Sequence, residues 1–484
     1  MSHPIPIRRR FLFSALGVFA TVSSAGAQWA AYPLDPGVEW TEAFGGDATG
    51  QAGALGVNGF PHAALWNGTA ASLVDLHPAG YFSSRCAAAR GGVQGGWAQT
   101  ATGDHAGVWS GSAGTWSDLH PNGYDSSRIS GVDGATRVGA AITSNPFMVH
   151  AGLWNGSSFT HLHPTGASLS WAYACRGNQQ VGVVQNSGVS RATLWTGTAT
   201  SGVDLTPAGA NAAWAFATDG SQQVGIAEFA GVRHAALWTG SAASFVDLHP
   251  WNSNWSEVNG VDQGAQVGWS SVPFGSPHAV YWTGSAASFV DLHSSLPPQF
   301  TSSRATAIWH QGGKPYVIGT AMGPGGTRAF LWKRLELTTY CTAKVNSLGC
   351  TPQIAGLGNA SASSNNPFNV RALNLRNQTS GLLFYGLSGR DNTPFAGGTM
   401  CVAAPRLRAP LLNSTGNNPP SVDCSGFFLF DMNAFRGGWL GGSPAPFLST
   451  PGTLVNCQYW ARDPGFAPPN AVQLSNALEY EIGP

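Results

Sequence analysis

The chain has 484 residues, and only 10% of them are charged, where a soluble domain usually carries about 25%. Its 23 basic and 23 acidic residues cancel, so the basic stripe that a nucleic-acid-binding protein requires is missing. The 43% hydrophobic content excludes a disordered chain, and the length favours two or more domains. Glycine (64 residues) and tryptophan (19 residues) are both abundant.

The first residues have the pattern of an export signal. Three arginines at 8–10 precede a short apolar run at 11–22, and the small residues 25–27 form a cleavage site. The run is too short to span a bilayer, so residues 1–27 are interpreted as a cleaved signal peptide rather than a buried strand. The arginines also fit twin-arginine export, and both routes stay open. We therefore expect a secreted or cell-surface protein without a membrane span in the mature chain.

An internal repeat organises residues 28–338. An apolar residue followed by tryptophan recurs at intervals of 41 to 50 residues, at Trp66, Trp109, Trp154, Trp195, Trp238, Trp282 and Trp332. About nine residues later stands an Asp-Leu-His-Pro signature or a variant of it, whose third residue is His77, His120, His163, Thr206, His249 or His293. These six positions are 43 or 44 residues apart, which is too regular to be accidental.

Each repeat divides into four short apolar pieces separated by turn residues. In the fourth copy the pieces are 171–175, 181–184, 192–195 and 203–205. Four strands in about 43 residues are typical of a β-propeller blade, so the seven copies predict an all-β, seven-bladed β-propeller. An open solenoid is the main alternative, but it would need polar end repeats that the sequence lacks.

The residues before each tryptophan carry a resemblance. Five repeats have a His-Ala pair there, as in His62-Ala63, and a preceding strand often reads Gln-Val-Gly, as in Gln180-Val181-Gly182. This pattern resembles the HAF-repeat family of bacterial extracellular proteins over roughly residues 40–335. The resemblance implies the propeller fold and an extracellular setting, and says almost nothing about activity. The family's Asp-Leu-Gly is replaced here by Asp-Leu-His-Pro, so the turn differs.

Residues 339–484 form a second module. The 43-residue period stops, and alternating apolar residues at 370–375, 381–385 and 427–430 predict a small β-sandwich. Segments 340–350, 423–426 and 458–464 resemble a module at the C-termini of secreted proteins of environmental Gram-negative bacteria. That resemblance implies a role in display, sorting or attachment. It also implies the disulfides Cys341–Cys350 and Cys401–Cys424, with Cys457 left over.

The remaining cysteines and the histidines are given structural roles. Cys86 and Cys175 fall in non-adjacent blades and are interpreted as small buried hydrophobic residues. Ten of the 13 histidines stand at repeated positions, which in adjacent blades lie too far apart to share a metal ion. Without any Cys-x-x-Cys motif, we expect neither a metal site nor a cofactor.

Acidic residues outside the repeated turns are few, which argues against an enzyme. A glycosidase needs two converging carboxylates. The non-repeated acids of the propeller show no pairing pattern: Glu39, Glu42, Asp104, Asp125, Glu228 and Glu257. The nucleophile elbow, the phosphate loop, the His-Glu-x-x-His motif and the sialidase Asp box are all missing from the sequence.

One pattern suggests a ligand. Arginine or tryptophan stands eight residues after four of the Leu-His or Leu-Thr steps, and near the matching point of other blades, giving a predicted rim of Trp40, Arg85, Arg128, Trp171, Trp214, Trp255 and Arg304. Tryptophan stacks on sugars and arginine binds carboxylates, so an acidic polysaccharide is the ligand class considered. The favoured alternative is that these side chains pack on one another through cation–π contacts.

Three functions are weighed. The leading hypothesis is a non-catalytic extracellular binding or surface protein, expected to be a monomer whose partner is a polysaccharide or a surface protein. The second is a structural envelope component that binds other proteins. An extracellular polysaccharide lyase or hydrolase is the third.

Overall fold

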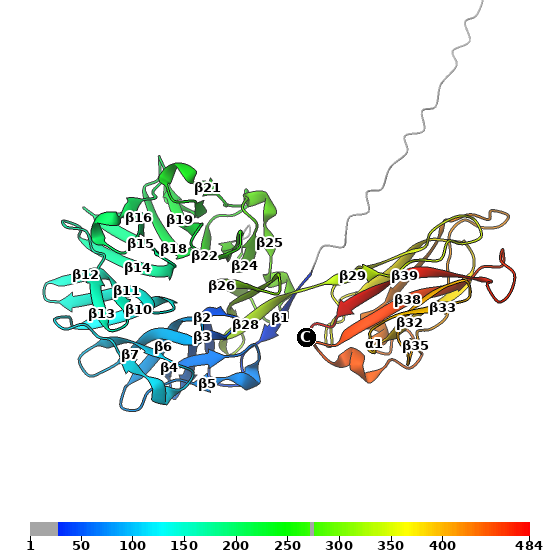
Figure 1. The fold of residues 1–484 in the computed structure, drawn as a ribbon, viewed down its shortest axis with the longest axis horizontal. Coiled ribbons are helices and arrows are strands. Elements are labelled where there is room, and N and C mark those ends of the chain that lie inside the picture. The colour runs from blue at the N-terminus through cyan, green and yellow to red at the C-terminus, as the bar shows by residue number, and fades with distance from the viewer. Residues whose placement is uncertain (1–27, 272–274) are drawn as a thin grey trace, which may run out of the picture.

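The computed structural model describes residues 28–271 and 275–484, which form two β domains (Figure 1). The expected signal peptide, residues 1–27, lies outside the described residues. Seven four-stranded antiparallel sheets surround a common centre, which confirms the seven-bladed β-propeller. Within the described ranges, no helix has the length and apolar character needed to cross a membrane.

Six blades are built from four consecutive strands, the first being the innermost. Blades 1 to 3 contain β2 (Thr41–Asp47), β3 (Gly50–Val57), β4 (Phe60–Trp66), β5 (Val74–Asp75), β6 (Ser83–Arg90), β7 (Val93–Gln99), β8 (Asp104–Trp109), β9 (Ser117–Asp118), β10 (Ser126–Asp133), β11 (Thr136–Ser144), β12 (Phe147–Asn155) and β13 (Ser158–His161). Blades 4 to 6 contain β14 (Leu169–Arg176), β15 (Gln179–Asn186), β16 (Val189–Trp195), β17 (Val203–Asp204), β18 (Ala212–Thr218), β19 (Gln223–Phe229), β20 (Val232–Trp238), β21 (Val246–Asp247), β22 (Ser256–Asp262), β23 (Ala265–Ser271), β24 (Pro277–Trp282) and β25 (Val290–Asp291).

The seventh blade is completed by the other end of the chain. Its strands β26 (Ser302–Gln311), β27 (Lys314–Gly323) and β28 (Gly326–Leu335) are joined by β1 (Gln28–Pro33), which pairs with β28 as the outermost strand (Figure 1). The Leu34 amide donates to the Ala329 carbonyl oxygen just beyond β1. The innermost strands of blades 7 and 1 also touch. The ring is therefore closed, which rules out the open solenoid and leaves the outermost strand of each blade as a free sheet edge.

The repeated sequence positions make the core between the blades. All seven repeat tryptophans are fully buried. A glutamine in the second strand of five blades is buried too (Gln51, Gln94, Gln180, Gln223 and Gln266). Its side-chain oxygen accepts from a turn glycine after the tryptophan, as Gln180 Oε1 does from the Gly197 amide at 2.7 Å. The periodic residues therefore serve packing and turn formation.

Every innermost strand carries a β-bulge opposite a glycine. The bulged residues are Phe44, Ala87, Ser130, Tyr173, Phe216, Asn259 and Thr306. A Cβ on the glycine paired just before each bulge would meet a carbonyl oxygen of the inner strand; at Gly182 it would lie 1.9 Å from the Trp171 oxygen. The glycine of the Gln-Val-Gly pattern is thus required by the close approach of two backbones.

Hydrogen bonds that we call histidine latches connect neighbouring blades. His77 Nδ1 bonds Ser84 Oγ at 2.9 Å, its Nε2 bonds the Tyr81 carbonyl oxygen, and Ser84 Oγ accepts from the Ala63 amide. The ring of His62 stacks on His77 with centroids 4.0 Å apart. The Nδ1–Oγ bond recurs between His120 and Ser127, His163 and Ser170, His249 and Ser256, and His293 and Ser303. This confirms a structural role for most of the repeated histidines.

The second domain is a β-sandwich, as expected. One sheet has the order β29 (Leu337–Tyr340), β39 (Val472–Glu481), β38 (Leu454–Arg462), β32 (Ser380–Gly386) and β35 (Leu407–Arg408), with β36 (Leu412–Asn413) also on β32. The other contains β30 (Gln353–Leu357), β31 (Asn369–Leu375) and β37 (Gly426–Asp431). β33 (Arg390–Phe395) and β34 (Gly398–Val402) form a hairpin, and α1 (Met432–Arg436) follows β37. The boundary expected between residues 338 and 339 falls inside β29.

Both sheets of this domain share one apolar core. Val370 and Phe428 from the smaller sheet pack with Leu383, Tyr459 and Tyr480 from the larger one, and all five are buried. The Tyr459 hydroxyl donates to the Val370 carbonyl oxygen at 2.7 Å and so links the two layers.

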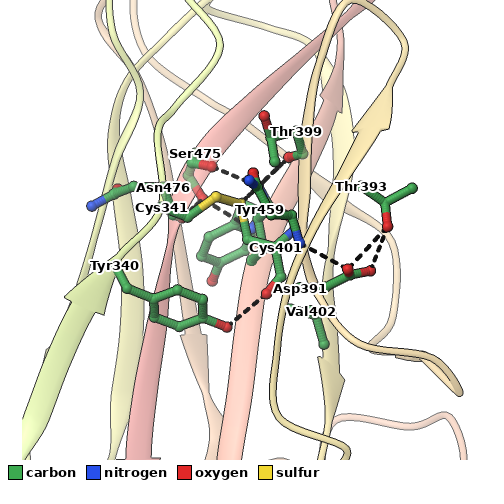
Figure 2. The surroundings of a disulfide bond; sticks show 12 residues. Tyr340, Cys341, Asp391, Thr393, Thr399, Cys401, Val402, Tyr459, Ser475 and Asn476 are labelled. Carbon is green, nitrogen blue, oxygen red and sulfur yellow. Dashed lines mark hydrogen bonds between the residues drawn. A yellow bond between two sulfur atoms is a disulfide. The ribbon is translucent and has the colours of Figure 1, made fainter.

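The four cysteines expected in disulfides do form them, but the expected pairing is wrong. The bonds are Cys341–Cys401 and Cys350–Cys424. Figure 2 shows the first, with the Tyr340 hydroxyl donating to the Cys401 carbonyl oxygen at 2.9 Å. Each bond thus joins the start of the domain to a distant segment instead of closing a short local loop.

The three other cysteines are buried free thiols, as expected of small core residues. Burial raises the pKa of Cys175 to about 12, which leaves its thiol protonated and unreactive.

Peptide mapping without reduction should yield linked fragments containing Cys341 with Cys401 and Cys350 with Cys424. Replacing Cys341 and Cys401 together by serine should lower the free energy of unfolding of this domain by about 2–5 kcal/mol, because the unfolded chain gains freedom. A fragment linking Cys341 to Cys350 would contradict the structure.

Candidate functional site

Inner-strand residues at one face of the propeller form the candidate site. Five of the predicted rim residues occupy equivalent positions, two residues before the bulge of their strand: Arg85, Arg128, Trp171, Trp214 and Arg304. The same position holds Glu42 in blade 1 and Glu257 in blade 6. We call these seven residues the inner-strand ring.

Trp40 and Trp255, which the sequence argument placed in the rim, stand two residues earlier in their blades. Trp40 packs against Gly56, where a Cβ would lie 2.3 Å from the indole nitrogen. Trp255 is 51% exposed, and Trp251 in the same loop is 94% exposed. Eight residues after His249 stands Glu257, so the same spacing rule would have placed Glu257 in the ring instead of Trp255.

Two of the ring arginines are neutralised by carboxylates. Arg85 Nη1 lies 3.0 Å from Glu42 Oε2, and Arg128 Nε lies 2.7 Å from Asp104 Oδ2. The sequence did not reveal these ion pairs, because the arginine and the carboxylate of each pair belong to adjacent blades. Among the described residues, Arg304 makes no ion pair within 4.0 Å and is exposed. Its guanidinium is the ring cation that remains available to an anion.

The arginines also lie over aromatic rings. The Arg85 guanidinium is 5.6 Å from the centre of Phe44, that of Arg128 is 5.0 Å from Trp97, and that of Arg304 is 4.2 Å from Trp269. Phe44, Trp97 and Trp269 lie outside the predicted rim. Among the described residues, one cation–π contact joins two predicted rim residues, with the Arg85 guanidinium 5.9 Å from the centre of Trp40. The packing is firmest for Arg85 and Arg128, which have both an aromatic and an acidic partner.

Glu257 is the ring carboxylate with the most unusual surroundings. It is half-buried, and this burial raises its pKa, while Trp269, Arg304 and Asn259 act in the opposite direction by stabilising the ionised form. Trp269 lies directly across the sheet from Glu257, and Arg304 of the next blade covers the same indole. Glu257, Trp269 and Arg304 therefore form a compact acid–aromatic–base group.

The bulged residues of blades 4 and 5 give the ring an aromatic side. Tyr173 and Phe216 have ring centroids 5.5 Å apart, and Trp171 stacks beside Tyr173. Trp171 Nε1 donates to Ser130 Oγ at 3.0 Å, which fixes the indole. Burial raises the pKa of Tyr173 to about 12, so its phenol stays neutral. Sequence reasoning missed these bulged residues, although the first six are 43 residues apart.

A cleft of about 1380 Å³ lies between the seventh blade and the sandwich. Aromatic Trp29, Phe300 and Phe330 line it together with polar side chains that include Asn359 and Asn365. Its position at a domain boundary makes it a second place where a ligand could bind.

Several acidic residues around the ring are paired with arginines. Glu42 and Asp104 are engaged by arginines, while Glu228 and Glu257 both lie near Arg233. In the described part of the chain, no three His, Cys, Asp or Glu side chains gather around a common point.

No protein-family model matches the chain, and no curated protein matches it either. Its structure is similar to that of puromycin hydrolase, with a TM-score of 0.42, 11% identity and coverage of 71% of this chain but only 62% of that chain. It is also similar to Trypanosoma rangeli sialidase, with a TM-score of 0.33, 9% identity and coverage of 93% of both chains. TolB from Acinetobacter baumannii gives a TM-score of 0.30, 13% identity and coverage of 58% and 76%. With values this low, the site is interpreted from its own residues.

Proposed function

We propose that the protein is a secreted, non-catalytic binding protein whose propeller recognises an acidic polysaccharide beside blades 6 and 7. The export pattern of residues 1–27, the HAF-like repeats and the two disulfides support a location outside the cytoplasm. The absence of a basic stripe argues against nucleic acid as the partner.

The observation that carries the proposal is the exposed Arg304 guanidinium next to Glu257, with Trp255 at the start of the Glu257 strand. A half-exposed indole offers a face on which a sugar ring can stack. Arginine binds the carboxylate of a uronic acid through two parallel hydrogen bonds, and Glu257 accepts hydrogen bonds from sugar hydroxyls. These three groups match the three chemical features of an acidic sugar.

Binding of uronic-acid-containing, sulfated and neutral polysaccharides to the purified protein tests the proposal, with calorimetry as the readout. We expect uronic-acid chains to bind, and Arg304→Gln to weaken binding about tenfold or more through loss of a charge-assisted hydrogen bond. Trp255→Ala should weaken it as well.

Arg85→Gln is the matched control, because Arg85 is already paired with Glu42 and its loss should leave affinity unchanged. Asn365→Ala reports on the cleft between the domains. If only Asn365→Ala weakens binding, the site lies in that cleft, and if no acidic polysaccharide binds, the proposal fails. Release of shortened or unsaturated sugars would instead show a hydrolase or lyase.

Attachment to a surface protein is a second candidate function, favoured by one observation on the sandwich. Leu411 and Trp439 are 69% and 63% exposed. Leu429 on β37, which belongs to the same domain, is exposed as well. Apolar side chains that gather in one patch are typical of contact surfaces, and the loop after Trp439 approaches the residue before Leu411, since a Cβ at Gly442 would lie 3.2 Å from Pro410. Loss of surface retention on replacing Leu411 and Trp439 by serine, with polysaccharide binding intact, would support this role.

A further inference from the structure

Blade 3 departs from the other blades at one repeated position. In blades 1, 2, 5 and 6, an aspartate binds Nδ1 of the His-Ala histidine at 2.7–2.9 Å, as Asp118 does with His105. The corresponding residue of blade 3 is His161, which faces the His-Ala histidine His150. A carboxylate partner has thus been replaced by a second imidazole.

Tyr124 brings a third donor to this pair. Its hydroxyl lies 3.4 Å from His150 Nδ1 and 3.5 Å from His161 Nδ1. Both distances exceed the roughly 2.7–3.2 Å of good hydrogen bonds. They match the separation of about 3.3–3.4 Å between two ligands of a tetrahedral zinc ion with bonds of about 2.0–2.1 Å.

We propose that His150, His161 and Tyr124 form a binding site for a zinc ion on the face of blade 3. Imidazole nitrogens are among the preferred ligands of zinc, and the Tyr124 phenol adds a weaker oxygen donor that must lose its proton to the bound ion. The exposure of His161 leaves a coordination position open to water. The sequence argument against metal binding concerned equivalent histidines of adjacent blades, whereas these ligands meet around a single blade.

Neighbouring side chains hold the donors in place. The His163 ring stacks on His150 with centroids 4.0 Å apart and is anchored by Ser170 Oγ at 2.7 Å. Phe159 packs edge-on against both Tyr124 and His161. Burial and the nearby His161 lower the pKa of His150, which keeps it in the neutral form that binds metal. Burial raises the pKa of the Tyr124 phenol, so the two imidazoles are the stronger ligands.

Calorimetric titration of the chelator-treated full protein with Zn²⁺ tests the site. We expect one ion per chain with micromolar affinity. His161→Asp copies the aspartate of four other blades, so it should fold well. The carboxylate should bond His150 Nδ1 directly, as in those blades, which keeps this nitrogen protonated and should weaken zinc binding at least about tenfold. Tyr124→Phe should weaken binding less.

Thermal unfolding gives a second readout. Zn²⁺ should raise the midpoint temperature of the unaltered protein, because the ion binds only the folded state, and should not raise that of His161→Asp. Failure of the unaltered protein to bind Zn²⁺, or equal affinity in His161→Asp, would overturn the proposal. His105→Gln in blade 2 is the control for non-specific histidine binding, and it should leave zinc affinity unchanged.

Discussion

Replacing Gly182 by alanine should destabilise the propeller by about 3 kcal/mol or more, the upper range for inserting a methyl group into a packed interior. The new Cβ would lie 1.9 Å from the Trp171 carbonyl oxygen and 2.9 Å from the Ala172 Cα. Both are backbone atoms of β14, so no side-chain rotation relieves the clash. The strand would have to move away from β15, and the bulge at Tyr173 would change with it.

Denaturant unfolding followed by tryptophan fluorescence measures this effect. Gly225→Ala should behave alike, because its Cβ would lie 2.0 Å from the Trp214 oxygen. Gly114→Ala is the matched control. It lies in a turn where a Cβ has no neighbour within 4 Å, so it should change stability by at most about 1 kcal/mol, in the stabilising direction. Equal effects at Gly182 and Gly114 would contradict the close strand approach.

The repeat predicted the blades well because each blade is built from local contacts. A buried tryptophan, a buried glutamine and a glycine recur at the same positions of successive strand hairpins. The closure of the ring was not predictable in this way. The seventh repeat has no Asp-Leu-His-Pro step after Trp332, and its outer strand comes from Gln28–Pro33 at the opposite end of the chain.

The candidate site was predicted only in part, for a similar reason. The eight-residue spacing correctly located Arg85, Arg128, Trp171 and Trp214, because the loops before these strands have equal length. It could not show that Arg128 reaches Asp104 of the preceding blade. The disulfides show the same limit: Cys341 has Cys350 near it in sequence, but strand pairing places Cys401 beside it instead.

The propeller should lose stability as the pH falls from about 7 to 5, because burial favours the neutral imidazole in several histidine latches. In the latch of His77, Nε2 donates to the Tyr81 carbonyl oxygen, so Nδ1 must accept from Ser84 Oγ. Burial lowers the pKa of His77 below its usual 6.5, and the stacked His62 lowers it further, while Asp75 acts in the opposite direction. The same causes lower the pKa of His249, which faces His234 and Asp247, and of His293, which faces His278 and Asp291.

The sign of this effect follows from proton binding. Between the lowered pKa of the folded protein and 6.5, the unfolded chain binds more protons than the folded one. The stabilisation is therefore complete above pH 6.5 and declines as the pH falls below it. The loss should be about 1 kcal/mol per latch, the value of an ordinary hydrogen bond. The window from pH 7 to 5 lies above the usual pKa of carboxylates, about 4, so histidines dominate the change.

Blade 4 supplies the control for this prediction, because it has Thr206 and Ala213 where other blades have the latch histidine and serine. His249→Thr combined with Ser256→Ala reproduces that junction between blades 5 and 6. The double variant should be less stable than the original protein at pH 7.5, yet its free energy of unfolding should change less between pH 7 and 5. Equal pH slopes in the two proteins would show that the latch of His249 does not sense pH. A steeper slope in the variant would contradict the lowered pKa of His249, because it would show that protonation of this histidine strengthens the junction.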